Sequence, residues 1–289
     1  MEYGIVLPHH EIGTDPGAMK AFAQGAEALG GSHVLLYDHV MGADPNRPGG
    51  WPKSRYDKDI AFHEPFTTFA FIAAVTTKLT MMSTVLILPQ RQTVLVAKQA
   101  AQVALLSGGR FRLGIGTGWN RVEYEALNED FHTRGKRQAE QVDLLRKLWR
   151  DDNLTYRGKW HTVTAASINP RPAATIPIWF GGNAPALLQR CAELGDGWIP
   201  LGGPTPASAD AIATIRRHRE SAGLPWTGFG IQAQAQYGGG NPERWQSHAR
   251  KWRDMGATHL AVATYNAGNV GVDAHLRAAA SYLSAVREL

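Results

Sequence analysis

Short apolar runs alternate with longer stretches of helical period along the whole chain. This alternation is typical of parallel β/α units, in which each buried strand is followed by a helix that covers it. Because the unit repeats eight times, the pattern predicts one domain over residues 1–289, an α/β fold of the (β/α)8 TIM-barrel type rather than an open doubly wound sheet. The expected strands are residues 3–7, 33–37, 79–88, 111–115, 176–180, 197–199, 229–235 and 259–263.

The residues at the expected helix ends agree with this pattern. Three helices should begin at a capping side chain followed by proline, which suits the first helical position. Glycines follow five helical stretches, where a left-handed residue commonly ends a helix. The capping pairs are Asp15-Pro16, Thr205-Pro206 and Asn241-Pro242, and the glycines are Gly30, Gly108, Gly195, Gly223 and Gly256.

Two insertions interrupt the repeat. Residues 42–62 follow the second strand and are rich in proline, glycine and charge. Loops of this length are usually lids over a site or mobile segments. Residues 151–175 precede the fifth strand, and residues 154–161 within them are expected to form a small hairpin.

Composition narrows the class of protein. Hydrophobic residues make up 44% of the 289 residues and charged residues 19%, as in globular proteins with a large core. There is no apolar run of about 18 residues, and the first residues lack a signal peptide, so we expect a cytoplasmic protein without a membrane contact. The net charge of +5 comes from scattered Lys and Arg, which favours a small anionic ligand over nucleic acid.

Candidate chemistry lies where the strands end, because barrel active sites form there. Asp38 and His39 follow the second strand, and a neutral imidazole can exchange protons near neutral pH. A structural hydrogen-bonding role for this histidine is the alternative. His9 and His10 leave the first strand and either line the same pocket or lie in a solvated loop. The histidines show no ligand spacing, so no metal is expected.

Two glycine motifs follow later strands. Gly114-x-Gly116-x-Gly118 opens the loop after the fourth strand, where α/β proteins bind phosphates and planar cofactors. Three glycines that simply turn a tight corner would look the same. Gly181-Gly182-Asn183 precedes a helix expected from about residue 184, whose free amides could bind a phosphate. A turn in which Asn183 caps that helix is compatible with the same role.

Several motifs together resemble the luciferase-like monooxygenase superfamily, and within it the branch that uses the deazaflavin coenzyme F420. The match follows the same order over nearly the whole chain. It is carried by residues 105–111 (LLSGGRF), 114–119 (GIGTGW), 123–134, 178–183 (IWFGGN) and 195–198 (GDGW).

The resemblance implies roles for residues at four strand ends. His39 would face cofactor and substrate as the catalytic acid or base, with Asp38 as a cofactor contact. Relatives have a non-prolyl cis peptide in the third strand, which backs the deazaflavin ring and would fall between Thr84 and Val85. The remaining implied cofactor contacts are Ser83, Thr117 and Gly118, with the phosphate at Gly181, Gly182 and Asn183.

Trp119 departs from part of that family. The sugar-phosphate dehydrogenases of the family have a glutamate at this position, a proposed proton donor. A tryptophan there makes glucose-6-phosphate a doubtful substrate and suggests an aromatic wall for a less polar one.

The resemblance favours an F420-dependent oxidoreductase that transfers a hydride between the deazaflavin C5 and a small organic substrate. An FMN-dependent monooxygenase that uses reduced flavin and O2 is the alternative, with a flavin or F420 reductase as functional partner. A non-catalytic flavin-binding barrel is a third possibility. A non-redox sugar-phosphate isomerase lacks a clear pair of catalytic carboxylates. The resemblance also implies a homodimer, to which the apolar residues 94–106 lend some support.

Overall fold

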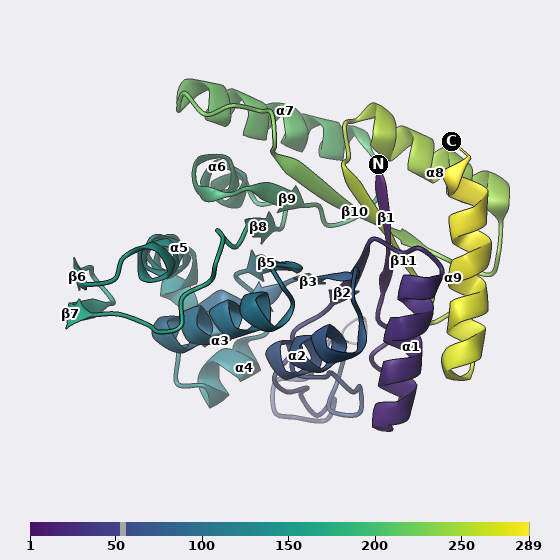
Figure 1. Ribbon diagram of the computed structural model, residues 1–289, viewed down its shortest axis with the longest axis horizontal. Coiled ribbons are helices and arrows are strands. Elements are labelled where there is room, and N and C mark those ends of the chain that lie inside the picture. The colour runs from purple at the N-terminus through teal and green to yellow at the C-terminus, as the bar shows by residue number, and fades with distance from the viewer. Residues whose placement is uncertain (53–55, 289) are drawn as a thin grey trace.

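The computed structural model describes residues 1–52 and 56–288, and within them parallel strands close into a barrel surrounded by helices (Figure 1). The third strand of the barrel is split into β3 and β4. Strand β3 also pairs with β5, which closes the ring. The predicted TIM barrel is therefore confirmed. In order around the ring, the strands are β3 (Thr80–Ser83) with β4 (Leu86–Ile87), β2 (His33–Leu36), β1 (Glu2–Val6), β11 (His259–Ala263), β10 (Gly230–Gln236), β9 (Gly197–Ile199), β8 (Ile178–Gly181) and β5 (Phe111–Gly116).

Helices cover the outside of the barrel, and most of them pack against the next helix in the ring. The C-terminal helix α9 packs against α1, so the last β/α unit lies beside the first. The covering helices are α1 (Pro16–Ala28), α2 (Pro65–Val75), α3 (Thr93–Leu106), α5 (Arg134–Arg150), α6 (Pro185–Leu194), α7 (Pro206–Ser221), α8 (Pro242–Asp254) and α9 (Gly271–Arg287). Shorter elements are α4 (Arg121–Ala126), η1 (Leu88–Gln90) and η2 (Phe131–Thr133).

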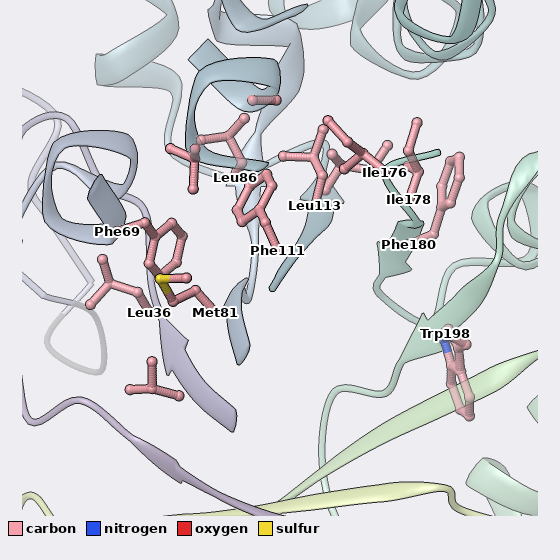
Figure 2. Close-up of a cluster of buried hydrophobic side chains, with 14 of the residues drawn as sticks. Leu36, Phe69, Met81, Leu86, Phe111, Leu113, Ile176, Ile178, Phe180 and Trp198 are labelled. Atoms are coloured by element: carbon pink, nitrogen blue, oxygen red, sulfur yellow. The ribbon is translucent and has the colours of Figure 1, made fainter. Parts of the chain in front are cut away.

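Alternation along the strands creates two cores. Side chains such as Leu36, Met81 and Phe180 point outward and pack with helix residues such as Phe69 (Figure 2). Their neighbours point into the barrel, where a smaller buried cluster fills the lumen. That inner cluster consists of Val6, Leu35, Met82, Trp179, Ile199, Ala261 and Ala263.

The expected helix ends are confirmed with one exception. Asp15, Thr205 and Asn241 each cap the helix that starts at the following proline. Gly195 is different, because its φ is −97° and the left-handed conformation predicted there is wrong. A Cβ at Gly195 would lie 2.6 Å from the carbonyl oxygen of Cys191, so the glycine is required for space rather than for handedness.

The two insertions have different structures. Residues 151–175 contain the predicted hairpin, formed by β6 (Leu154–Arg157) and β7 (Thr162–Ala166), which projects beyond α5 in Figure 1. The first insertion was expected over residues 42–62, of which 53–55 lie outside the described residues; its Tyr56 hydroxyl donates to Glu123 and accepts from Asn120 at the start of α4. Among the described residues, no helix is long and apolar enough to cross a membrane.

Candidate active site

A cavity of about 510 Å³ opens at the carboxyl ends of the strands. Tyr37 and Thr84 line one side of it, and the loop formed by residues 200–203 after β9 lines another. The side chains of Gln234, Arg244 and His248 also border the cavity. A pocket of this size at this end of a barrel is where such folds bind their ligands.

The third barrel strand, made of β3 and β4, bulges beside this cavity. The peptide bond between Thr84 and Val85 is cis, as the family resemblance implied, and it separates β3 from β4. The single strand expected over residues 79–88 is therefore interrupted at this bond. The Val85 side chain lies between two glycines, since a Cβ at Gly116 or Gly181 would come within 2.4 or 2.5 Å of its methyl groups. These glycines accommodate the bulge.

Ser83 supports the same bulge from below. Its hydroxyl donates to the Gly114 carbonyl oxygen (2.8 Å) and accepts from the Gly114 amide (3.1 Å). A Cβ at Gly114 would lie 1.9 Å from the Ser83 carbonyl oxygen. The glycines at 114 and 116 therefore serve close packing of the strands, while Gly118 has φ +67° and makes the turn that follows.

Thr84 offers an unused polar group to the cavity. Its hydroxyl oxygen is buried and has no hydrogen-bond partner among the described residues. Buried hydroxyls are normally paired, so a ligand that bonds to this oxygen would remove a cost. The cavity and this hydroxyl thus fit a bound planar cofactor with polar edges.

Asp38 holds the bulged third strand in place. This buried carboxylate accepts from the backbone amide of Ile87 (2.9 Å) and from Arg91 Nη2 (2.8 Å). Both of its oxygens are engaged within the protein. Its predicted contact with a cofactor stays a prediction.

His39 is paired with a glutamate that the sequence motifs did not single out. His39 Nδ1 lies 3.3 Å from Glu123 Oε1. Glu123 is only 1% exposed and comes from α4, the short helix after β5. A signal existed in the sequence, because Asn120 followed three residues later by Glu123 is a capping-box pattern that marks a helix start. Asn120 does cap α4, but Glu123 reaches across to the end of β2 instead of back to its own cap.

Aromatic rings surround His39. Tyr56 and Phe62, from the first insertion, lie 3.9 and 4.7 Å from its ring, measured between centroids. Trp119 lies farther, at 6.5 Å, and also contacts Tyr56 at 5.4 Å. Phe62 stacks in turn on His9 at 4.5 Å. We call these five residues the ring cluster.

The predicted pocket histidines lie at the edge of the ring cluster. His9 is buried, and burial together with nearby His10 lowers the pKa of its imidazole to about 3. It is therefore neutral at physiological pH. His10 Nδ1 lies 3.3 Å from His9 Nε2, and its other nitrogen lies 3.3 Å from Asn266. Trp119 and His9 thus share one cluster with His39, but none of the three is among the residues that line the cavity, so their place in a substrate pocket stays a prediction.

The predicted phosphate loop is packed against the next strand end. The Gly182 amide donates to the Ile199 carbonyl oxygen (3.1 Å), and the Asn183 side chain pairs with both backbone groups of Leu201. The prediction that Asn183 caps the following helix is wrong, because α6 starts at Pro185 after Ala184 and has no side-chain cap. The Asn183 side chain instead bonds to the loop at residues 200–203, which lines the cavity. Thr117, whose carbonyl oxygen accepts from Tyr124 (2.6 Å), lies at the end of β5 beside this region.

The chain belongs to the luciferase-like monooxygenase family, whose pattern it matches over residues 1–288. It is therefore an oxidoreductase, with a cofactor of the flavin or deazaflavin class. An uncharacterised protein of Mycobacterium tuberculosis (strain ATCC 25618 / H37Rv) is 36% identical over 207 residues, which cover 70% of this chain and 71% of that protein.

Two named enzymes are also similar. An F420-dependent glucose-6-phosphate dehydrogenase of Mycobacterium avium is 36% identical over 202 residues, and a pyrimidine monooxygenase of Pseudomonas savastanoi pv. phaseolicola is 32% identical over 206. The matches cover 65% and 68% of this chain but only 54% and 56% of those enzymes. A solved F420-dependent secondary alcohol dehydrogenase has the same fold, with a TM-score of 0.79, 14% identity, and coverage of 97% of this chain and 98% of that one.

Proposed function

We propose that the protein is an F420-dependent oxidoreductase that acts on a small organic substrate. The observation that carries the proposal is the cavity at the carboxyl ends of the strands. Its wall contains the bulge of the third strand and the unpartnered Thr84 hydroxyl. The similarity to an F420-dependent dehydrogenase supports it, as does the family. When bound, F420 supplies or accepts a hydride at C5 of its deazaflavin ring.

The residues of this chain would divide the remaining work. Thr84 and Val85 would support the ring, and the loops at residues 181–183 and 200–203 would receive the anionic part of the cofactor. The uncapped N-terminus of α6 offers backbone amides and a favourable dipole for such a group. His39 would hold or deliver the proton on the substrate oxygen, and the ring cluster would exclude water around it.

The ring cluster also bears on the substrate. Trp119, Phe62 and Tyr56 present aromatic surface beside His39. A substrate with an alcohol or carbonyl group on an apolar or aromatic frame suits this wall better than a sugar phosphate. Trp119 thus distinguishes this protein from the sugar-phosphate dehydrogenases of the family, which have a glutamate at this position.

Direct titration of the purified protein tests the cofactor. F420 is expected to bind more tightly than FMN. Comparable or tighter binding of FMN would favour an FMN-dependent monooxygenase supplied by a reductase, in line with the pyrimidine monooxygenase relative. Tight binding without turnover on a broad panel of alcohols and ketones would favour a non-catalytic flavin-binding protein.

We also propose that the protein is a homodimer. Val94, Leu95 and Leu106 of α3 are 46%, 52% and 56% exposed, and Phe71 of α2 is 36% exposed. Large apolar side chains on neighbouring helices are typical of an interface between subunits. Sedimentation at micromolar concentration should give twice the monomer mass, and a monomer would contradict the proposal.

A further inference from the structure

We infer that Glu123 is a positioning residue that fixes His39 in one tautomer and leaves His39 Nε2 as the nitrogen that exchanges the proton with substrate. This inference rests on the proposed function, because it assigns the atom through which His39 would act. Glu123 does not touch the cavity; it acts through the imidazole.

Glu123 is a buried acceptor with many donors around it. Its Oε1 accepts from the backbone amides of Val40 (2.9 Å) and Met41 (3.4 Å), from the Tyr56 hydroxyl (3.2 Å) and from His39 Nδ1 (3.3 Å). Its Oε2 accepts from Gln90 Nε2 (3.0 Å). One carboxylate therefore ties the end of β2, the first insertion and η1 together.

The proton arrangement follows from the chemistry of a carboxylate. Burial alone would raise the pKa of Glu123, but hydrogen bonds from His39 and Gln90 outweigh it, and the pKa is lowered. An ionised carboxylate can only accept hydrogen bonds, so His39 Nδ1 must carry the hydrogen. The lone pair of the neutral imidazole is then on Nε2.

Charge pairing separates this glutamate from its neighbour Asp38. Asp38 is paired with Arg91, a permanent cation that also pairs with Glu64. Within the described part of the chain, Glu123 forms no ion pair with lysine or arginine, and its one ionic partner is His39. Its negative charge is therefore available to stabilise the imidazolium that forms when His39 takes a proton.

The other groups near His39 do not compete for that role. Tyr56 remains a neutral phenol, because burial and the Glu123 charge raise its pKa. His9 is neutral, as its lowered pKa requires, and Trp119 cannot ionise. Asp38 is paired with Arg91. Among these groups, the Glu123 carboxylate is thus the charged group that bonds directly to His39.

The experiment compares wild type with Glu123→Gln and Glu123→Asp, using Gln90→Met as the matched control. Gln90→Met removes a donor to the same carboxylate but leaves the His39 contact intact. Nitrogen-15 NMR of the imidazole, assigned with a His39→Gln variant, reads tautomer and titration in protein without cofactor. Turnover with F420, kcat and KM, and thermal unfolding are measured alongside.

In wild type and in Gln90→Met, the His39 ring should carry its hydrogen on Nδ1. In Glu123→Gln, the second tautomer should become populated, because the carboxylate that accepts the Nδ1 hydrogen is gone. The kcat should fall about 10-fold to 10³-fold while KM for F420 changes less than about threefold. Glu123→Asp, which keeps the charge, should recover part of the loss and serves as the test if Glu123→Gln does not fold.

Two results would overturn the inference. One is an unchanged tautomer in both Glu123 variants. The other is a changed tautomer with full turnover, in a protein whose His39→Ala variant is inactive. If His39→Ala itself retains wild-type turnover, the acid–base role in the proposed function fails, and with it the catalytic purpose of the pair, even though the NMR still shows the pairing.

Discussion

The two ends of the barrel both gather histidines and acidic or basic partners, yet they are built for different purposes. At the carboxyl end, His39 pairs with Glu123, and a cavity of about 510 Å³ opens among the strand ends. At the amino end, His259 Nε2 lies 3.1 Å from Glu2, and its ring lies 5.4 Å from that of His33. A histidine beside a carboxylate is therefore not enough to mark an active site.

The difference lies in what fills the centre of each end. At the amino end the Trp179 indole occupies the space left by two glycines, since a Cβ at Gly197 or Gly230 would come within 2.3 or 2.0 Å of it. Arg112 lies over the same indole, at 5.7 Å. A hollow of about 440 Å³ lies at this end, with Trp179 in its lining. At the carboxyl end the glycines accept the Val85 side chain, and the space above the bulge stays free for a ligand.

The largest expected effect separates the two ends by chemistry. His39→Ala should lower kcat by about 10²–10⁴, the usual contribution of a positioned acid or base. The matched variant at the amino end, His259→Ala, should keep turnover within about threefold in protein that remains folded at pH 7.5. Steady-state kinetics with F420 make the comparison, and equal losses in both variants would erase the distinction between the ends.

A smaller effect concerns the space between Gly116 and Gly181 that the Val85 side chain occupies. Gly181→Ala places a methyl group 2.5 Å from the Val85 side chain, so it should reduce the free energy of unfolding by about 1–3 kcal/mol. Val85→Ala in the same chain removes the clash and should restore much of that loss. Urea denaturation of the two single variants and the double variant gives the coupling energy. Additive losses would show that the two side chains do not meet.

The cavity loop allows a test of binding with little effect on folding. Gly203 lines the cavity, and an added Cβ would meet no atom within 4 Å. Gly203→Val should therefore weaken F420 binding about tenfold, while the free energy of unfolding changes by only about 0.5 kcal/mol. Gly182→Val is the contrasting variant, because Gly182 has φ +131° and a valine there would destabilise the fold as well. Normal F420 affinity in Gly203→Val would place the cofactor away from this loop.

The smallest expected effect is a pH dependence from the amino end. Burial lowers the pKa of His259 to about 4, below the value of about 6.5 in an unfolded chain. Between those values the unfolded state binds more protons, so stability is full above about pH 6.5 and is lost as the pH falls toward 4. His259→Gln should make the loss between pH 7.5 and pH 5 smaller by about 1–2 kcal/mol, measured by denaturant unfolding at both values. An unchanged slope would mean that His259 has the same pKa in the folded and the unfolded protein.

The sequence predicted the repeating parts well and the long-range contacts poorly. Strands, proline-capped helices and the hairpin follow from local pattern, and the place of the cis bond came from the family resemblance. Glu123 was missed because its partner His39 lies 84 residues away, and a six-residue helix has little periodicity to reveal which way its side chains point. Asn183 was misassigned because its side chain bonds to Leu201, outside its own helix. Gly195 was misassigned because the nearby Cys191 carbonyl oxygen, not a left-handed turn, requires a glycine there.

The seat of Val85 constrains how the site can evolve or be engineered. Three barrel strands meet at the Val85 side chain, so residues 85, 116 and 181 are not free to vary one at a time. An alanine at either glycine becomes tolerable only after residue 85 has become smaller, which makes the order of substitutions matter. A mutant library that varies the three positions together would therefore reach cavity shapes that single substitutions of the present sequence do not reach.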